Sequence, residues 1–133
     1  MQKRIFFILI TLILLTSALM SCKQKPPVLY ISLREEGIHN GSIILHWIVE
    51  NRSDKTVKFD KGSIMNYEIQ RHGTGQKITG KGDDTENITL KQGDIYDKTI
   101  VTPELTKGHY SATFWAEYDE NTRYTMSISF DID

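Results

Sequence analysis

The chain has 133 residues, with 16 lysine or arginine residues against 17 aspartate or glutamate residues, and a formal net charge of −1. Charges of both signs are interspersed along the chain, which disfavours a nucleic-acid partner because such a partner needs a clustered basic face. The single cysteine excludes an internal disulfide, and no Cys/His pattern for zinc is present. We therefore expect no nucleic-acid partner, no metal and no cofactor.

The first 21 residues have the three parts of an export signal. Two basic residues precede an apolar run over residues 5–15, and small residues follow it. Residues 19–22 then read Leu-Met-Ser-Cys, which resembles the lipobox of bacterial lipoproteins. The resemblance implies cleavage before Cys22 and a lipid with fatty-acid chains such as palmitate on its sulfur. The protein would be exported and anchored on the outer side of the cytoplasmic membrane, or in the outer membrane of a Gram-negative cell.

Two other interpretations of this segment remain open. A lasting transmembrane helix needs about 20 apolar residues, whereas the uncharged run over residues 5–20 is shorter and ends in small polar residues. A cleaved signal without lipid would leave Cys22 as an odd thiol in a secreted protein. We favour the lipoprotein hypothesis because it accounts for the apolar run, the small residues and the lone cysteine together.

The sequence predicts three regions. These are a signal peptide over residues 1–21, a lipidated cysteine with a proline-containing spacer over residues 22–27, and one domain over residues 28–133. Removing the signal takes away two basic residues, so 14 basic residues remain against 17 acidic ones and the net charge becomes −3. A domain of this length can bury a core without a disulfide.

After residue 27 apolar residues recur at every second position, with turn residues between the segments. Residues 35–41 are expected to form a turn or loop, and residues 73–86 a long surface loop or a weak edge hairpin. Residues 42–51 are apolar on both faces, which predicts a central strand covered on both sides. One face holds Ile43, Leu45, Trp47 and Val49, and the other holds Ile44, His46 and Ile48. The remaining strands are expected at residues 29–33, 56–59, 66–72, 88–90, 96–101, 108–118 and 124–132.

No segment of this region has apolar residues at helical spacing over a helical length. Seven or eight short strands in about a hundred residues predict an all-β fold, an antiparallel β-sandwich of immunoglobulin or fibronectin type III kind. A β-barrel is the alternative.

Three turn motifs occur in order along this region. Asn-Arg-Ser at residues 51–53 follows the expected central strand, Leu-Lys-Gln-Gly-Asp occupies residues 90–94, and Gly-His-Tyr at residues 108–110 starts the penultimate strand. Together they resemble the BsuPI family of bacterial intracellular proteinase inhibitors, over most of residues 43–133. The resemblance implies an immunoglobulin-like sandwich and a proteinase-inhibitor activity.

The chain departs from that family pattern in two places. Tyr67-Glu68 stands where the family has an aspartate-aromatic pair, and residues 76–78 lack the family's tryptophan. The founding activity of the family is also intracellular, whereas this chain has an export signal. We therefore expect the fold to carry over more readily than the target.

No residue pattern indicates a catalytic or metal site. The four histidines are scattered without metal-binding spacing, and Asp83-Asp84-Thr85-Glu86 lacks the alternating oxygen ligands of a calcium loop. No nucleophile elbow or phosphate-binding loop is present. The sequence therefore favours a protein that is not an enzyme.

Two tryptophans are candidates for a binding face. Trp47 shares a face with Ile43 and Leu45, so it is expected in the core. Trp115 points away from Phe114 and lies among polar residues, which makes it a candidate contact residue. Coverage of Trp115 by another strand or loop is the open alternative.

Two functions of different classes remain. The favoured one is an envelope lipoprotein that acts as a non-catalytic binding module for a protein, peptide or glycan partner. The alternative is a proteinase inhibitor that blocks a serine protease with loops at one end of the sandwich. Since loops carry function on such scaffolds, residues 34–41 and 73–87 are the candidate contact loops.

Overall fold

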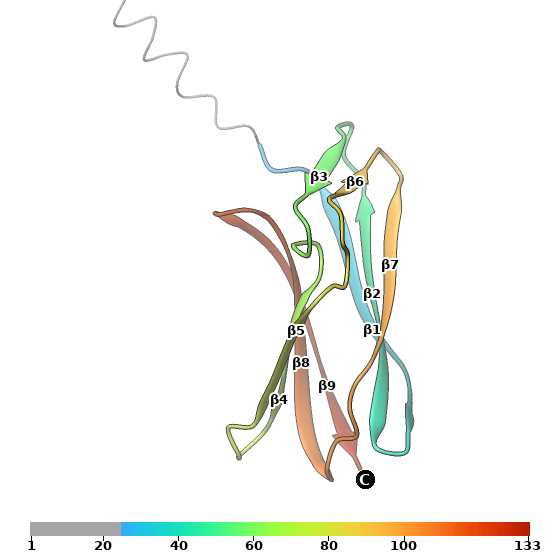
Figure 1. Ribbon diagram of the computed structural model, residues 1–133, viewed down its shortest axis with the longest axis vertical. Coiled ribbons are helices and arrows are strands. Elements are labelled where there is room, and N and C mark those ends of the chain that lie inside the picture. Colours follow the sequence, from blue (N-terminus) through green and yellow to red (C-terminus); the bar gives the residue numbers. More distant parts are fainter. Residues whose placement is uncertain (1–24) are drawn as a thin grey trace, which may run out of the picture.

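The computed structural model describes residues 25–133 (Figure 1). The expected signal peptide and the lipidation site Cys22 lie outside these residues. Within the described range no helix has the length and apolar character needed to cross a membrane. The strands are β1 (Leu29–His39), β2 (Ser42–Asn51), β3 (Val57–Phe59), β4 (Asn66–Arg71), β5 (Lys77–Lys81), β6 (Ile88–Leu90), β7 (Ile95–Val101), β8 (Gly108–Asp119) and β9 (Thr122–Ile132).

The strands form an antiparallel β-sandwich, which confirms the predicted fold class. One layer is the sheet β1-β2-β7 and the other is the sheet β5-β4-β8-β9, while β3 and β6 form a short separate pair (Figure 1). Every strand pair is antiparallel. The first described residues and the C-terminus lie at opposite ends of the sandwich (Figure 1).

The core between the two layers contains the residues that the alternating pattern places inward. Trp47 on β2 and Phe114 on β8 are fully buried, with ring centroids 5.8 Å apart across the layers. The Trp47 Nε1 group donates a hydrogen bond to the Ile64 carbonyl oxygen at 2.9 Å, so its polar atom is satisfied inside the core. The core position of Trp47 is thereby confirmed.

A second feature is typical of immunoglobulin-like sandwiches. Tyr110, near the start of β8, donates a hydrogen bond from its hydroxyl to the Thr106 carbonyl oxygen at 2.7 Å. Its ring stacks on Phe130 of β9 at a centroid distance of 5.6 Å. Such a tyrosine corner fixes the chain where it crosses from one sheet to the other.

The expected turn or loop at residues 35–41 is wrong for most of its length. The β1 strand continues to His39, with a register shift between Glu35 and Gly37. Only Asn40 and Gly41 form the connection to β2, and both have positive φ values, 51° and 78°. An Asn-Gly pair forms the tight two-residue turn that matches the twist of a hairpin, so the strands extend almost to the turn.

The hairpin interpretation of residues 73–86 is confirmed for its first half. β5 pairs with β4 and brings the number of strands in the described residues to nine, against the seven or eight expected. Gly80 faces Tyr67 across this pair, and a Cβ at Gly80 would lie 2.2 Å from the Tyr67 ring. The missing side chain therefore lets Tyr67 lie over β5 and stack on Phe114, with centroids 5.3 Å apart.

The β2 strand is central in its sheet, as predicted, but it is covered on one side only. Its inward residues are fully buried, whereas Ile44, His46 and Ile48 on the other face are half-buried. Among the described residues no second layer packs on this face. The expectation of cover on both sides is therefore wrong, because the aliphatic side chains of β2 are shielded only by their neighbours in β1 and β7.

Asn51 organises the end of the domain where the described chain begins. Its side-chain Nδ2 donates to the carbonyl oxygens of Lys55 and Leu90, at 2.7 Å and 2.9 Å, and Oδ1 accepts from the Ser53 backbone. Its backbone N–H donates to Asp94. The Asn-Arg-Ser turn, β6 and the turn before β7 are therefore fixed to each other through one buried amide.

Candidate functional site

The outer face of the β1-β2-β7 sheet carries several large apolar side chains that are exposed to water. Residues from the three strands lie in rows, such as Tyr30, Glu50 and Ile95, or Gly37, Ile44 and Val101. Ile95 and Val101 on β7 are 61% and 62% exposed, and Tyr30 on β1 is 44% exposed. Apolar groups at this exposure on one face of a sheet mark a candidate contact surface. We call this surface the aliphatic face.

His46 lies in the middle of the aliphatic face and joins its three strands. Its Nε2 lies 2.6 Å from a carboxylate oxygen of Glu36 on β1, and its Nδ1 lies 3.4 Å from Asp97 on β7. The Thr99 hydroxyl is 3.3 Å from the same Nδ1. The hydrogen bond to Glu36 raises the pKa of His46 above its usual 6.5, against a smaller lowering by burial, and Asp97 adds to the rise.

Charged groups border the aliphatic face. The Arg52 guanidinium lies 4.0 Å from the centre of the Tyr30 ring and is 2.9 Å from Glu50. This arrangement combines a cation–π contact with an exposed ion pair. Arg52 therefore covers the ring of Tyr30 and leaves the β7 aliphatic groups as the most accessible apolar part of the face.

Trp115, the contact residue proposed from the sequence, lies on the outer face of the other sheet. It is half-buried, and its orientation away from the buried Phe114 is as predicted. The Arg123 guanidinium lies 5.0 Å from its ring centre, and its Nε1 donates to Glu117 at 3.3 Å. Two side chains of the same sheet face thus lie against Trp115.

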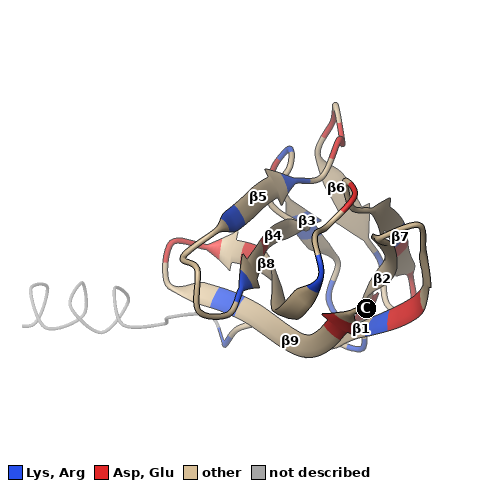
Figure 2. Ribbon diagram, turned by 90° about the horizontal axis from the view of Figure 1, so that it is seen from below, with Lys and Arg blue, Asp and Glu red and all other residues tan. Residues whose placement is uncertain are grey.

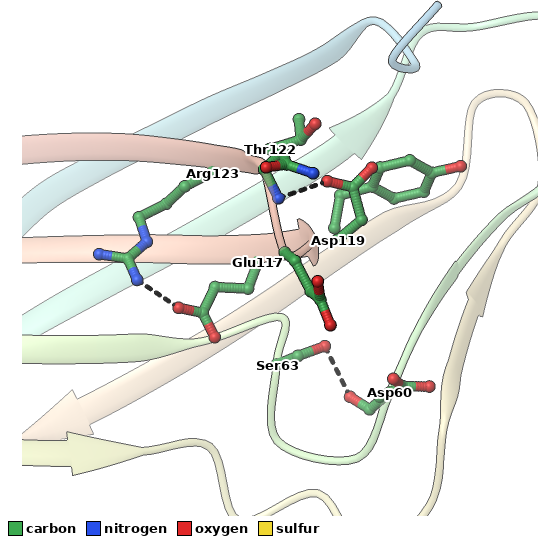
Figure 3. Close-up of a pocket in the computed structure, with 9 residues that line it drawn as sticks. Asp60, Ser63, Glu117, Asp119, Thr122 and Arg123 are labelled. Atoms are coloured by element: carbon green, nitrogen blue, oxygen red, sulfur yellow. Dashed lines mark hydrogen bonds and ion pairs between the residues drawn. The ribbon is translucent and has the colours of Figure 1, made fainter. Parts of the chain in front are cut away.

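The partners of Trp115 also line a cavity that the sequence did not indicate. This open cavity of about 590 Å³ lies between the β8–β9 hairpin and the turn after β3 (Figure 3). Figure 3 shows Arg123 directed at Glu117, and Asp60 bonded to Ser63 through its carbonyl oxygen. The lining residues are Asp60, Ser63, Glu117, Tyr118, Asp119, Glu120, Asn121, Thr122 and Arg123.

The charged residues that line the cavity are mainly acidic. The Asn121 backbone N–H donates to Asp119 at 2.8 Å, and this bond lowers the pKa of Asp119. The Asp119 carboxylate is therefore committed to closing the hairpin turn. Within residues 25–133, no three histidine, cysteine or acidic side chains are placed to hold a metal ion.

The structure brings together two histidines that are far apart in the sequence. The rings of His72 and His109 lie 4.6 Å apart, and His109 Nδ1 is 2.7 Å from Asp131. The His72 backbone N–H also donates to the His109 carbonyl oxygen. No local motif signals this pair, because pairing of β4 with β8 creates it.

The two loops proposed from the sequence differ in what they expose. Of residues 34–41 only the short β1–β2 turn is a loop, and the Leu105 N–H donates to Gly41 and holds this turn against the β7–β8 connection. Residues 82–87 lie along β7, where Asp83 binds Lys98 at 2.9 Å and the Tyr96 hydroxyl donates to Asp84 at 2.8 Å. Burial, with help from Asp84, raises the pKa of Tyr96. The β4–β5 turn, with Gly73 and Gly75 at positive φ, is the exposed loop that remains.

Basic and acidic segments are interspersed over the domain surface (Figure 2). This distribution of charge agrees with the interspersed pattern in the sequence. The feature that distinguishes one face of the domain from the rest is therefore its exposed aliphatic groups and not a patch of charge.

No protein-family model matches the chain, and no curated protein matches it. Among the solved structures that are similar to it are two at 15% identity. One is described as the "Putative ApaA Protein" from Bordetella pertussis, with a TM-score of 0.48 and 15% identity, covering 80% of this chain and 93% of the other. Another is target SoR45 of the Northeast Structural Genomics Consortium, with a TM-score of 0.46 and 15% identity, covering 77% of this chain and 83% of the other.

Proposed function

We propose that this protein is a cell-envelope lipoprotein, anchored in the membrane by a lipid on Cys22, that acts as a non-catalytic binding module for a protein or peptide partner. Its β-sandwich would be a BsuPI-like domain. The support for the anchor is the export signal that ends in Leu-Met-Ser-Cys at residues 19–22. The support for the binding role is the aliphatic face.

The aliphatic face carries this proposal because several of its aliphatic side chains are left exposed to water. Ile95 and Val101 each leave more than half of their surface in contact with water. In contrast, the outer face of the β5-β4-β8-β9 sheet has polar residues such as Thr113 and Ser127, whose hydroxyl groups are 2.8 Å apart. A protein partner that covers Ile95 and Val101 would gain the free energy of burying them.

The start of the domain would place the aliphatic face beside the membrane rather than against it. The Tyr124 hydroxyl donates to the Pro27 carbonyl oxygen and fixes the first described residues to β9. The six residues from Cys22 to Pro27 span at most about 20 Å. The faces of the sheets run along the length of the domain away from that end (Figure 1), so a partner outside the membrane can reach them.

Photo-crosslinking in the native host tests this proposal. A photoreactive amino acid at Val101 should give a discrete adduct with a partner, whereas the same group at Ser129, on the other sheet, should not. The Ile95→Lys variant should weaken the adduct at Val101, because it places a charge in the contact. An adduct of equal yield from both positions, or one unchanged by Ile95→Lys, would contradict binding through this face.

The β4–β5 turn provides a specific observation in favour of the inhibitor alternative, since this exposed, glycine-containing loop stands at the end of the sandwich away from the first described residues. The full chain can be assayed against a panel of subtilisin-like serine proteases. Saturable, stoichiometric inhibition that is lost when residues 73–75 are replaced by a serine-containing turn would establish inhibition. Cleavage of the protein, or no effect on the panel, would leave the binding module as the function.

A further inference from the structure

The outer strand of the aliphatic face, β7, has one edge without a backbone-paired strand among the described residues, and residues 82–87 bond to β7 through the side chains of Tyr96 and Lys98. The sheet order is β1-β2-β7, so β7 pairs with β2 on one side only. Its seven residues, Ile95–Val101, make a strand long enough to pair with another chain. The alternation of hydrogen bonds shows which of its backbone groups face outward.

The antiparallel ladder is pinned at both ends by observed bonds. Thr102 N–H donates to the Ile43 carbonyl oxygen, and Asn51 N–H donates to the Asp94 carbonyl oxygen. Between them the register runs without a shift from Glu50–Ile95 to Ile44–Val101. Because bonded and non-bonded pairs alternate in an antiparallel ladder, the even-numbered residues of β7 bond to β2. The N–H and C=O groups of Ile95, Asp97, Thr99 and Val101 therefore point to the free edge.

The same four residues carry the exposed side chains of β7 on the aliphatic face. Ile95 and Val101 lie at its two ends and are each more than 60% exposed. Asp97 and Thr99 lie between them, with Asp97 52% exposed in its side chain. The free edge thus has unpaired backbone groups and four outward side chains, which are in order an apolar residue, an acid, a hydroxyl residue and an apolar residue.

We propose that an extended segment of a partner polypeptide adds to this edge as a further antiparallel strand. This inference deepens the proposed function and rests on it, because it names the class of partner that the aliphatic face takes. Backbone hydrogen bonds to the odd-numbered residues of β7 would supply affinity, and the side chains would supply specificity. Complementarity predicts a segment with aliphatic residues opposite Ile95 and Val101, a basic residue opposite Asp97 and a hydroxyl residue opposite Thr99.

A second copy of this chain fits the edge less well than a foreign strand. Symmetric antiparallel pairing that matches Ile95 with Val101 of the second copy would place Lys98 opposite itself. Like charges directly opposite each other destabilise a strand pair. Lys98 points to the inner side of the sheet, where its Nζ lies 2.9 Å from Asp83 and 3.8 Å from Asp84. Its positive charge disfavours pairing of β7 with the β7 strand of a second copy. A foreign segment with a neutral residue at that position avoids this repulsion.

A designed peptide tests the site on the full chain in detergent micelles. The probe is a dye-labelled heptapeptide with valine, threonine, lysine and isoleucine at positions one, three, five and seven, and threonine elsewhere. Fluorescence anisotropy should show saturable binding. The same peptide with N-methyl groups at positions three and five, or with glutamate in place of lysine, should bind at least about tenfold more weakly, since each change removes an edge bond or reverses the charge opposite Asp97.

Variants at one position of the protein separate edge pairing from general adsorption. Thr99→Pro removes an N–H that faces the free edge and leaves the ladder to β2 intact, so the fold should persist. Thr99→Val loses the same hydroxyl group but keeps the N–H. We expect Thr99→Pro to lower peptide affinity at least about tenfold, and Thr99→Val to lower it by less than about fivefold through loss of the hydroxyl contact alone, with both variants melting alike.

Three outcomes would overturn the edge site. These are the absence of saturable peptide binding, equal binding by Thr99→Pro and Thr99→Val, and a dimer of the unmodified chain that Thr99→Pro converts to a monomer. A cross-linked partner at Val101 that persists in Thr99→Pro would overturn edge pairing while leaving the binding module in place. If Thr99→Pro loses that partner and Thr99→Val keeps it, the result supports both the edge site and the binding module.

Discussion

The Nε2 atom of His46 lies 2.6 Å from a carboxylate oxygen of Glu36, and this contact joins the centre of β2 to the register shift of β1. Asp97 on β7 approaches the other ring nitrogen at 3.4 Å. One imidazole therefore links the three strands of the aliphatic face. A protonated ring is held by both carboxylates, which makes the strength of this link depend on pH.

We expect the stability of the domain to fall as pH rises from about 6.5. The pKa of His46 is raised in the folded state, first by Glu36 and then by Asp97. Its stabilising contribution is fully present below its unfolded pKa of about 6.5 and is lost as pH rises through the higher folded pKa. Water screens this exposed contact, so we expect about 0.2–1 kcal/mol. Urea unfolding between pH 5.5 and pH 8.5 measures it.

Three variants identify the source of this pH dependence. His46→Gln should remove the decline above pH 6.5, and Glu36→Gln should reduce it strongly. Asp97→Asn should reduce it less, because Asp97 is farther from the ring than Glu36. A decline of unchanged size in His46→Gln would assign the pH dependence to another group.

Asn51→Ala should destabilise the domain by about 2–4 kcal/mol, because the buried Leu90 carbonyl oxygen loses its donor and the turn after β2 loses three hydrogen bonds. Asn121→Ala, in the exposed β8–β9 turn, is the matched control and should change stability by less than about 0.5 kcal/mol. Denaturant unfolding compares the two. Equal losses of stability in the two variants would show that the Asn51 amide does not hold together the end of the domain where the described chain begins.

The core and the outer face of β8 should respond differently to truncation. Phe114→Ala removes a fully buried ring in contact with Trp47 and Tyr67, so it should cost about 3–5 kcal/mol. Trp47→Ala and Phe130→Ala should cost similar amounts. Trp115→Ala should cost much less, since Trp115 is half-buried among polar neighbours. Unfolding by Trp115→Ala with Phe114→Ala still folded would contradict the register of β8.

The anchor prediction concerns Cys22, which lies outside the described residues. If a lipid is attached to its sulfur, the full chain should partition into the detergent phase, because each buried CH₂ of an acyl chain adds about 0.8 kcal/mol to membrane affinity. Cys22→Ser removes the attachment atom and should shift the protein to the aqueous phase. Equal partitioning of the two forms would contradict the lipoprotein assignment. A C-terminal affinity tag follows both forms.

The period-two pattern of the sequence was sufficient to predict the β-sandwich and most of its core residues. Strict alternation in residues 124–132 placed Phe130 and Ile132 inward, and the face of Ile43, Leu45, Trp47 and Val49 is fully buried as expected. Alternation is reliable here because a one-residue slip would move every side chain of a strand to the wrong face. The Asn-Gly pair at residues 40–41 also specifies its own turn, although the length of β1 before it was underestimated.

The contact surfaces depended on pairing between distant segments, which a local pattern does not specify. His46 meets Glu36 and Asp97 only because β1 and β7 lie on either side of β2, and sequence alone predicted that the outer face of β2 would be covered. Trp115 meets Arg123 through the β8–β9 register. The free edge of β7 likewise follows from the order of strands in the sheet. Local side-chain periodicity determines which residues face the core, whereas tertiary pairing decides which exposed residues become neighbours and which backbone edge stays open.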